Sequence, residues 1–149
     1  MRTVTPSEPT DILLVEDNPG DATLISDAFD QVADDVRVHT VSDGAEAISY
    51  LSDHRETSSF PDLLLLDLNV PRVHGLELLE TLQEESGLTT LPVIVLTCSD
   101  DESDIAESYD RRANAYLTKP NSHDEYVSLA RAVDEFWVRT AQLPSVTAA

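Results

Sequence analysis

Five short apolar runs, each followed by a segment with helical spacing, constrain the fold of this 149-residue chain more than any other feature. Runs 11–16, 62–67 and 92–97 are apolar in their interiors, as expected of strands that are covered on both faces of a sheet. Run 36–41 alternates between polar and apolar residues, and run 115–118 is short, which is typical of edge strands. This alternation predicts an α/β fold with a five-stranded parallel sheet and five helices.

The length of the chain suits one domain, which at this size buries roughly 70% of the surface that the unfolded chain exposes. We expect the domain to span residues 11–142. A flexible segment, 1–10, contains two prolines and precedes it, and a short tail, 143–149, follows it.

Residues that cap helices predict where the helices begin. Asn18 precedes Pro19 at the start of the first helix. Three further helix starts have the spacing of a capping box: Asp43 with Glu46, Ser99 with Glu102, and Ser122 with Glu125. The face of the first helix that should pack on the sheet carries Ile25, Ala28, Phe29 and Val32. The fourth helix, at about 100–112, is the least apolar of the five.

Acidic residues outnumber basic ones by 29 to 9, which gives the chain a net charge of −20. Lys and Arg hold the phosphates of nucleic acids, so this charge argues against a nucleic-acid-binding surface. No apolar stretch approaches the roughly 20 residues that span a bilayer, and the N-terminal residues lack the apolar core of a signal peptide. The single cysteine, Cys98, provides no disulfide framework. We therefore expect a cytoplasmic protein without membrane contact.

Polar side chains stand at the ends of four of the predicted strands. They are Glu16 and Asp17 after the first, Asp67 after the third, Thr97 at the end of the fourth, and the only lysine, Lys119, after the fifth. Because the carboxyl ends of parallel strands meet at one edge, these side chains should lie together. Three close carboxylates repel one another unless they share a cation, and oxygen ligands on an open edge suit Mg²⁺. A hydroxyl and an ammonium opposite the ion would cradle a phosphoryl group, with Asp67 as the nucleophile.

In these residues the sequence resembles the response-regulator receiver domains of two-component signalling, over about residues 11–140. The acidic pair of that family matches Glu16 and Asp17, and its phosphorylated aspartate matches Asp67. The remaining signature residues match Pro71, Gly75, Thr97, Tyr116, Lys119 and Pro120. All of these positions occur in the order that the family requires, which makes the resemblance specific.

The resemblance implies a flavodoxin-like, doubly wound sheet with strand order 2-1-3-4-5. It also implies a Lys119–Pro120 peptide bond that is usually cis in the family. The segment SYDRRANAYLTKP and the pair Phe136 and Trp137 resemble small stand-alone regulators that partner phytochrome-type sensor kinases. A stand-alone regulator would have no output domain, so its signal would leave by protein contact.

The resemblance further implies a phosphoacceptor mechanism rather than that of a conventional enzyme. The implied ligands of Mg²⁺ or Mn²⁺ are Asp17, Asp67, the backbone carbonyl of Asn69 and, through water, Glu16. Asp67 would accept a phosphoryl group from a sensor histidine kinase or a phosphotransfer protein, and Thr97 and Lys119 would bind its oxygens. Movement of Thr97 would let Tyr116 turn inward as a switch. The fourth helix, fifth strand and fifth helix would then contact a downstream protein or a second copy of the chain.

Three positions near this edge are expected to tune how long the phosphoryl group lasts. Asn69 and Ser99 match the variable positions that tune dephosphorylation in the family. Cys98 stands where Ala, Ser or Gly is usual, so its larger side chain could narrow access to Asp67 or restrict Tyr116. In other respects we expect Cys98 to be a small buried side chain without a redox role.

Other functions fit the sequence less well. A dinucleotide site needs a glycine-rich first turn, whereas EDNPGD has a single glycine. A haloacid-dehalogenase-type phosphatase needs a second aspartate where this chain has Asn69. None of His39, His54 and His74 has metal-ligand spacing with another histidine or cysteine. The alternative that stays open is a receiver-like module that binds partners without being phosphorylated.

A broad apolar stripe on the last helix has two interpretations. The stripe consists of Tyr126, Ala130, Val133 and Trp137, with Leu129 and Phe136 beside it. Either these side chains close the core, or part of the stripe pairs with another protein or a second copy; the pair of aromatics at its end favours the second interpretation.

The charge pattern also generates a prediction about salt. Eight of the nine basic residues are arginines, and the surface is strongly acidic. In about 1 M salt the Debye length is only about 3 Å, so self-repulsion of such a surface is largely screened. We hypothesise that the protein comes from a halophile, and we expect its melting temperature to fall when salt is removed. Thermal unfolding across a salt series tests this, and a melting temperature that does not fall would contradict it.

Overall fold

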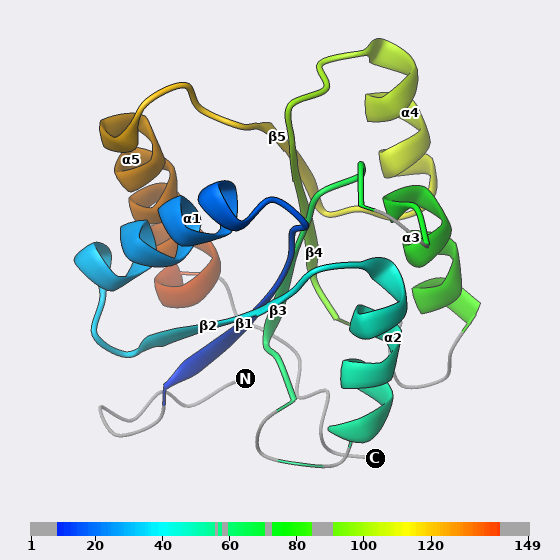
Figure 1. The fold of residues 1–149 in the computed structure, drawn as a ribbon, viewed down its shortest axis with the longest axis horizontal. Coiled ribbons are helices and arrows are strands. Elements are labelled where there is room, and N and C mark those ends of the chain that lie inside the picture. The colour runs from blue at the N-terminus through cyan, green and yellow to red at the C-terminus, as the bar shows by residue number, and fades with distance from the viewer. Residues whose placement is uncertain (1–8, 56, 58–59, 71–72, 85–90, 141–149) are drawn as a thin grey trace.

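A parallel sheet of five strands forms the middle layer of the computed structural model, which describes residues 9–55, 57, 60–70, 73–84 and 91–140 (Figure 1). The strands are β1 (Thr10–Val15), β2 (Val36–Val41), β3 (Leu63–Leu66), β4 (Val93–Thr97) and β5 (Ala115–Thr118). Their spatial order is β2-β1-β3-β4-β5, and every neighbouring pair is parallel. The predicted fold class and strand order are confirmed, including β2 and β5 as the edges.

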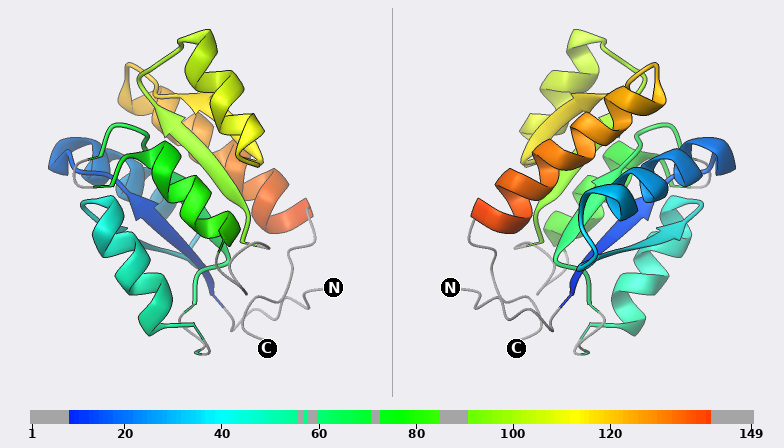
Figure 2. Two further views of the ribbon diagram at one scale, coloured as in Figure 1. Left: turned by 90° about the vertical axis from the view of Figure 1, so that its right-hand side faces the viewer. Right: turned by 90° about the vertical axis from the view of Figure 1, so that its left-hand side faces the viewer.

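Helices cover both faces of the sheet (Figures 1 and 2). They are α1 (Pro19–Val32), α2 (Gly44–Asp53), α3 (Gly75–Glu84), α4 (Glu102–Asp110) and α5 (His123–Val133), which continues as a π-helical segment, Asp134–Thr140. Helices α1 and α5 lie side by side on one face, and α2, α3 and α4 lie on the other. Among the described residues, no helix combines the length and the apolar character needed to cross a bilayer.

The four leucines of β3 explain why its sequence is a continuous apolar run. Leu64 and Leu66 pack with α2 and α3, whereas Leu63 and Leu65 pack with α1 and α5. All four side chains are fully buried. Since successive side chains of a strand point to opposite faces, a strand in the centre of a three-layer fold needs apolar residues at every position.

Three of the predicted helix caps are confirmed, and one is wrong. The side chains of Asn18, Asp43 and Ser122 accept hydrogen bonds from backbone N–H groups at the starts of α1, α2 and α5. Helix α4 instead begins after Asp101, whose carboxylate accepts from the N–H of Ser103 at 2.8 Å. Ser99 does not cap it: its hydroxyl accepts from the N–H of Asp101, which precedes the helix, at 3.3 Å and donates to the carboxylate of Asp104 at 2.6 Å.

Other differences from the sequence prediction are small. Strand β1 ends at Val15 and β3 ends at Leu66, so the acidic residues follow the strands instead of ending them. None of the described peptide bonds is cis, so the Lys119–Pro120 bond is trans, contrary to expectation. The two isomers of an X–Pro bond differ by only about 0.5–1 kcal/mol, so the motif alone does not decide between them. Pro71, most of segment 1–10 and the whole tail 143–149 lie outside the described residues.

The apolar stripe on α5 is mostly part of the core. Tyr126, Ala130 and Val133 are buried among side chains of α1 and the sheet, and Trp137 is half-buried against them. Phe136, in contrast, is 56% exposed. The stripe therefore closes the core as far as Trp137, and a docking role for Phe136 stays a prediction.

Because Gly75 has no side chain, the start of α3 can lie close to the backbone of Asp67 and Leu68. A substitution at this position should therefore destabilise the fold. A Cβ atom at this position would lie 2.6 Å from Cα of Leu68 and 3.1 Å from the carbonyl oxygen of Asp67. We expect Gly75→Ala to lower the free energy of unfolding by about 1–3 kcal/mol, because this backbone cannot move aside cheaply. Chemical denaturation measures the change.

Gly20→Ala on α1 is the matched control. Its new Cβ would meet only the side-chain oxygen of Asn18, at 3.2 Å, and no backbone atom. We expect its free energy of unfolding to stay within about 0.5 kcal/mol of the wild type. Equal stability of the two variants would contradict the account of Gly75.

Candidate functional site

The register of the sheet brings the polar strand ends together, as predicted. Glu16 and Asp17 follow β1, Asp67 follows β3, Thr97 ends β4, and Lys119 follows β5. Backbone hydrogen bonds continue the ladders past the strands: the N–H of Asp67 donates to the carbonyl of Val15 at 3.0 Å, and that of Lys119 donates to Thr97 at 2.8 Å. The core that orders the strands therefore also places these side chains.

Three carboxylates form an acidic trio at this edge: Glu16, Asp17 and Asp67. One oxygen from each lies within 4.8 Å of the others. Glu16 and Asp67 are 2% and 6% exposed, whereas Asp17 is open to solvent. A partly open group of oxygen donors is the ligand set that Mg²⁺ and Mn²⁺ prefer, so the trio fits such an ion.

The ammonium group of Lys119 lies among carboxylates. Its Nζ atom is 2.6 Å from Oε1 of Glu16, 3.0 Å from Oδ2 of Asp67 and 2.9 Å from Oδ2 of Asp21. The contacts with Glu16 and Asp67 were expected from the strand ends. Asp21, in the first turn of α1, was not predicted, because the sequence shows it only as one of many acidic residues near helix starts.

Both oxygens of Asp67 accept hydrogen bonds. The hydroxyl of Thr97 donates to Oδ1 at 3.0 Å, and the backbone N–H of Asn69 donates to the same oxygen at 3.1 Å. Lys119 donates to Oδ2 at 3.0 Å. Thr97 is fully buried, so this contact is shielded from water. These donors hold the carboxylate of Asp67 in one orientation at the carboxyl-terminal edge of the sheet.

The two buried carboxylates of the trio differ in their pKa. Burial alone would raise the pKa of Asp67, but the hydrogen bonds from Asn69, Lys119 and Thr97 hold it below its usual value. For Glu16, burial dominates over its hydrogen bond with Lys119, and repulsion by Asp67 adds to it, which raises its pKa to about 7. Burial opposes the charge of Lys119, but its three carboxylate partners raise its pKa above the ordinary value. Asp67 is thus the carboxylate that stays ionised.

Comparison with known proteins identifies the family to which this geometry belongs. A family model described as the response regulator receiver domain matches residues 12–131. The chain belongs to the response regulator receiver family. Its members are signalling proteins that receive a phosphoryl group from histidine kinases or phosphotransfer proteins, and the arrangement of aspartates, hydroxyl and lysine around one edge of the sheet is consistent with that class.

Individual relatives agree with this assignment. The chain is 34% identical to response regulator Rcp1 of Synechocystis sp. (strain ATCC 27184 / PCC 6803 / Kazusa), over 92% of this chain and 95% of the relative. The structure of the phosphorylated cyanobacterial phytochrome response regulator RcpA matches with a TM-score of 0.84 and 41% identity, over 92% of this chain and 99% of the other. The structure of Mn²⁺-bound Rcp1 matches with a TM-score of 0.80 and 32% identity, over 92% and 100%.

The tyrosine of this receiver domain that was predicted to act as a switch, Tyr116, is half-buried on β5. Its hydroxyl donates to the backbone carbonyl of Ser99 at 2.7 Å, and its backbone N–H donates to the hydroxyl of Tyr109 at 3.2 Å. Tyr116 is therefore tied to the loop after β4 and to α4. These bonds join it to the segment that carries Thr97 and Ser99.

The three positions expected to tune the phosphoryl lifetime surround the receiver's acidic edge. Asn69 is exposed and follows Asp67 by two residues, and Ser99 is half-buried in the loop before α4. Cys98 is exposed, so the expectation of a buried side chain is wrong. The physical reason is that β4 ends at Thr97, and the chain leaves the sheet at the next residue.

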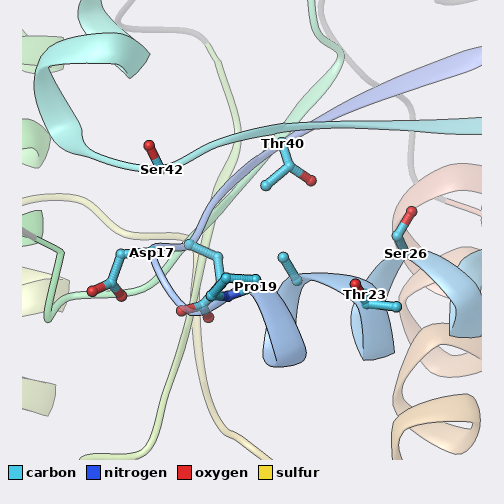
Figure 3. Close-up of a pocket in the computed structure, with 8 residues that line it drawn as sticks. Asp17, Pro19, Thr23, Ser26, Thr40 and Ser42 are labelled. Carbon is cyan, nitrogen blue, oxygen red and sulfur yellow. The ribbon is translucent and has the colours of Figure 1, made fainter.

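A pocket of about 420 Å³ lies beside the acidic trio, between α1 and the end of β2. Figure 3 shows Asp17 at one end of it and Ser26 at the other, with Thr23 and Thr40 between them. Glu16 and Asp17 both line the pocket, and most of the remaining lining consists of small polar side chains. The pocket therefore reaches two members of the trio, Glu16 and Asp17, from the side of α1.

The raised pKa of Glu16 predicts how stability depends on pH. Its pKa is about 7 in the folded chain and near the ordinary 4.5 in the unfolded chain, so between these values the folded state binds more protons. The contribution of Glu16 to stability is therefore present below pH 4.5 and is lost as the pH rises through about 7. In a chelator, we expect the free energy of unfolding of the wild type, relative to Glu16→Gln, to fall by about 2 kcal/mol from pH 5 to 8.

Denaturant unfolding at a series of pH values measures this difference. The Glu16→Gln variant is the reference, because it keeps an oxygen for Lys119 and cannot ionise. A difference between the two proteins that stays constant with pH would contradict the assignment.

Proposed function

We propose that Asp67 accepts a phosphoryl group from a phosphohistidine of a sensor histidine kinase or phosphotransfer protein, in a reaction that requires Mg²⁺ or Mn²⁺. The observation that supports this most directly is the state of Asp67. It is held ionised by Asn69, Thr97 and Lys119, and it lies beside two further carboxylates that suit a cation. The lone pairs of such a carboxylate make it a nucleophile.

In the proposed reaction, an oxygen of Asp67 forms a bond to phosphorus and the bond from phosphorus to the histidine nitrogen breaks. The nitrogen keeps the electron pair, and the product is an acyl phosphate on Asp67. Lys119 and Thr97 already donate to the two oxygens of Asp67, so they are placed to donate to the oxygens of the transferred group. A divalent ion on Asp17, Asp67, the backbone carbonyl of Asn69 and, through water, Glu16 would neutralise developing negative charge. Attack of water on phosphorus would return Asp67 to its free form.

The proposed signal leaves through protein contact. When Thr97 turns toward the phosphoryl group, its loop moves, and the hydrogen bond from Tyr116 to Ser99 lies in that loop. Asn69, Cys98 and Ser99 border the site and would set the lifetime of the acyl phosphate. The changed surface of α4, β5 and α5 would contact a downstream protein or a second copy of the chain.

The likeness to relatives supports a stand-alone regulator. Alignments cover 95% of Rcp1 and 99% of the structure of the phytochrome response regulator RcpA. We infer that the chain acts with a sensor kinase of a related type. The lone cysteine favours a reducing compartment such as the cytoplasm.

Phosphorylation of the full chain tests the proposal. In the presence of Mg²⁺ and a small acyl phosphate donor, we expect intact-mass spectrometry to show one added phosphoryl group on the wild type and none on Asp67→Asn. Asp30→Asn makes the same chemical change at an exposed position of α1 and should be labelled like the wild type.

Two outcomes would overturn the proposal. One is a wild-type chain that stays unlabelled and whose tryptophan fluorescence does not respond to beryllofluoride, which would favour a module that binds partners without phosphorylation. The other is equal labelling of Asp67→Asn, which would place the phosphoryl group elsewhere.

A further inference from the structure

Asp21 contacts Lys119 from outside the acidic trio. Its Oδ2 atom accepts a hydrogen bond from Nζ at 2.9 Å, across 98 positions of sequence. The side chain of Asp21 is 30% exposed, whereas that of Lys119 is 5% exposed, so the contact lies at the border of the buried site. The backbone N–H of Asp21 is itself bound by the side chain of Asn18 at 3.0 Å. The start of α1 therefore fixes where this carboxylate lies.

The three carboxylates around Lys119 have different roles in the proposed site. The ammonium donates hydrogen bonds to Asp21 and Asp67, and it forms an ion pair with Glu16 at 2.6 Å. Glu16 and Asp67 also belong to the trio that suits a cation, and one oxygen of Asp67 would become part of the acyl phosphate. Asp21 belongs to neither. It is the acceptor that can hold the ammonium unchanged while its other two partners change their own contacts.

We propose that Asp21 is a positioning residue, which holds the ammonium of Lys119 at the edge of the sheet so that it can meet the phosphoryl group on Asp67. This inference rests on the proposed function. The lysine side chain has four rotatable bonds, so it loses much conformational freedom when it is fixed in one position. Without Asp21, the ammonium would exchange among Glu16, Asp67 and solvent and would no longer keep one position.

A simpler role for Asp21 is the stabilisation of α1. An acidic residue in the first turn interacts favourably with the helix dipole, wherever its carboxylate points. That role would change only the stability of the helix. The positioning role changes the order of Lys119 and the rate of phosphoryl transfer as well, so these two quantities distinguish the interpretations.

The single lysine makes the contact directly observable. In the full chain labelled with ¹⁵N-lysine, the side-chain ammonium signal can arise only from Lys119. In the metal-free wild type at low temperature we expect a resolved signal whose protons are protected from exchange. In Asp21→Ala we expect this signal to broaden or disappear, and in Asp21→Glu, which keeps the charge, we expect it to return in part.

The second readout is the initial rate of Asp67 phosphorylation by a small acyl phosphate at saturating Mg²⁺. A hydrogen bond between charged groups is worth about a factor of ten, so we expect Asp21→Ala to be roughly tenfold slower. Asp21→Asn keeps an acceptor oxygen without the charge and should fall between the two. Asp27→Ala removes an exposed acid from the same helix and should change neither readout.

Each outcome decides between the interpretations. If Asp21→Ala is less stable but keeps the ammonium signal and the wild-type rate, Asp21 only stabilises the helix and the proposal is overturned. If Asp21→Ala does not fold, Asp21→Asn and Asp21→Glu carry the test, and wild-type behaviour of Asp21→Asn in both readouts overturns the proposal. A wild-type chain that cannot be phosphorylated overturns the proposed function itself, whereas a labelled wild type with an equally fast Asp21→Ala overturns only the role of Asp21.

Discussion

The arrangement of the acidic edge depends on the ion pairs that the ammonium group of Lys119 forms with the surrounding carboxylates. In the part of the chain that the structure describes, this ammonium is the one positive charge paired with Glu16, Asp21 and Asp67, and it lies within 3.0 Å of an oxygen of each. Its presence does not affect the carboxylates equally. Burial still raises the pKa of Glu16, while hydrogen bonds from Asn69, Lys119 and Thr97 lower that of Asp67. Two neighbouring carboxyl groups whose pKa values move apart can take different roles, and the ionised one is Asp67.

The register of the central strand β3 determines the position of Asp67. β3 is buried on both faces, so its register with β1 and β4 is set by leucines on two sides. A slip of one residue would exchange the two core clusters and move Asp67 with them. Behind it, Gly75 brings the start of α3 against Leu68 and the backbone of Asp67. Asp67 therefore lies in a closely packed part of the molecule.

Sequence periodicity and parallel topology were enough to predict the strands, which two of them lie at the edges, and the grouping of the polar residues. The sequence did not predict features that depend on contacts between distant segments. The strand ends could be grouped because parallel strands must finish at one edge. The sequence could not decide whether Ser99 or Asp101, two residues apart, caps α4, since the hydrogen bond from Ser99 to Asp104 exists only in the folded chain. The contact of Asp21 with Lys119 joins positions 98 residues apart, and no local pattern marks it.

Helix α4 is the helix that can respond to the site at the lowest energetic cost. Its only buried residue is Ser108, whereas α3 buries three leucines. Moving α4 therefore exposes little apolar surface, and the energy needed lies mainly in its polar contacts. Those contacts run to the site: Ser99 donates to Asp104 of α4, and Tyr109 of α4 accepts from Tyr116. In the proposed mechanism, a change at Thr97 would reach α4 through these hydrogen bonds, which supports an output surface on this side of the molecule.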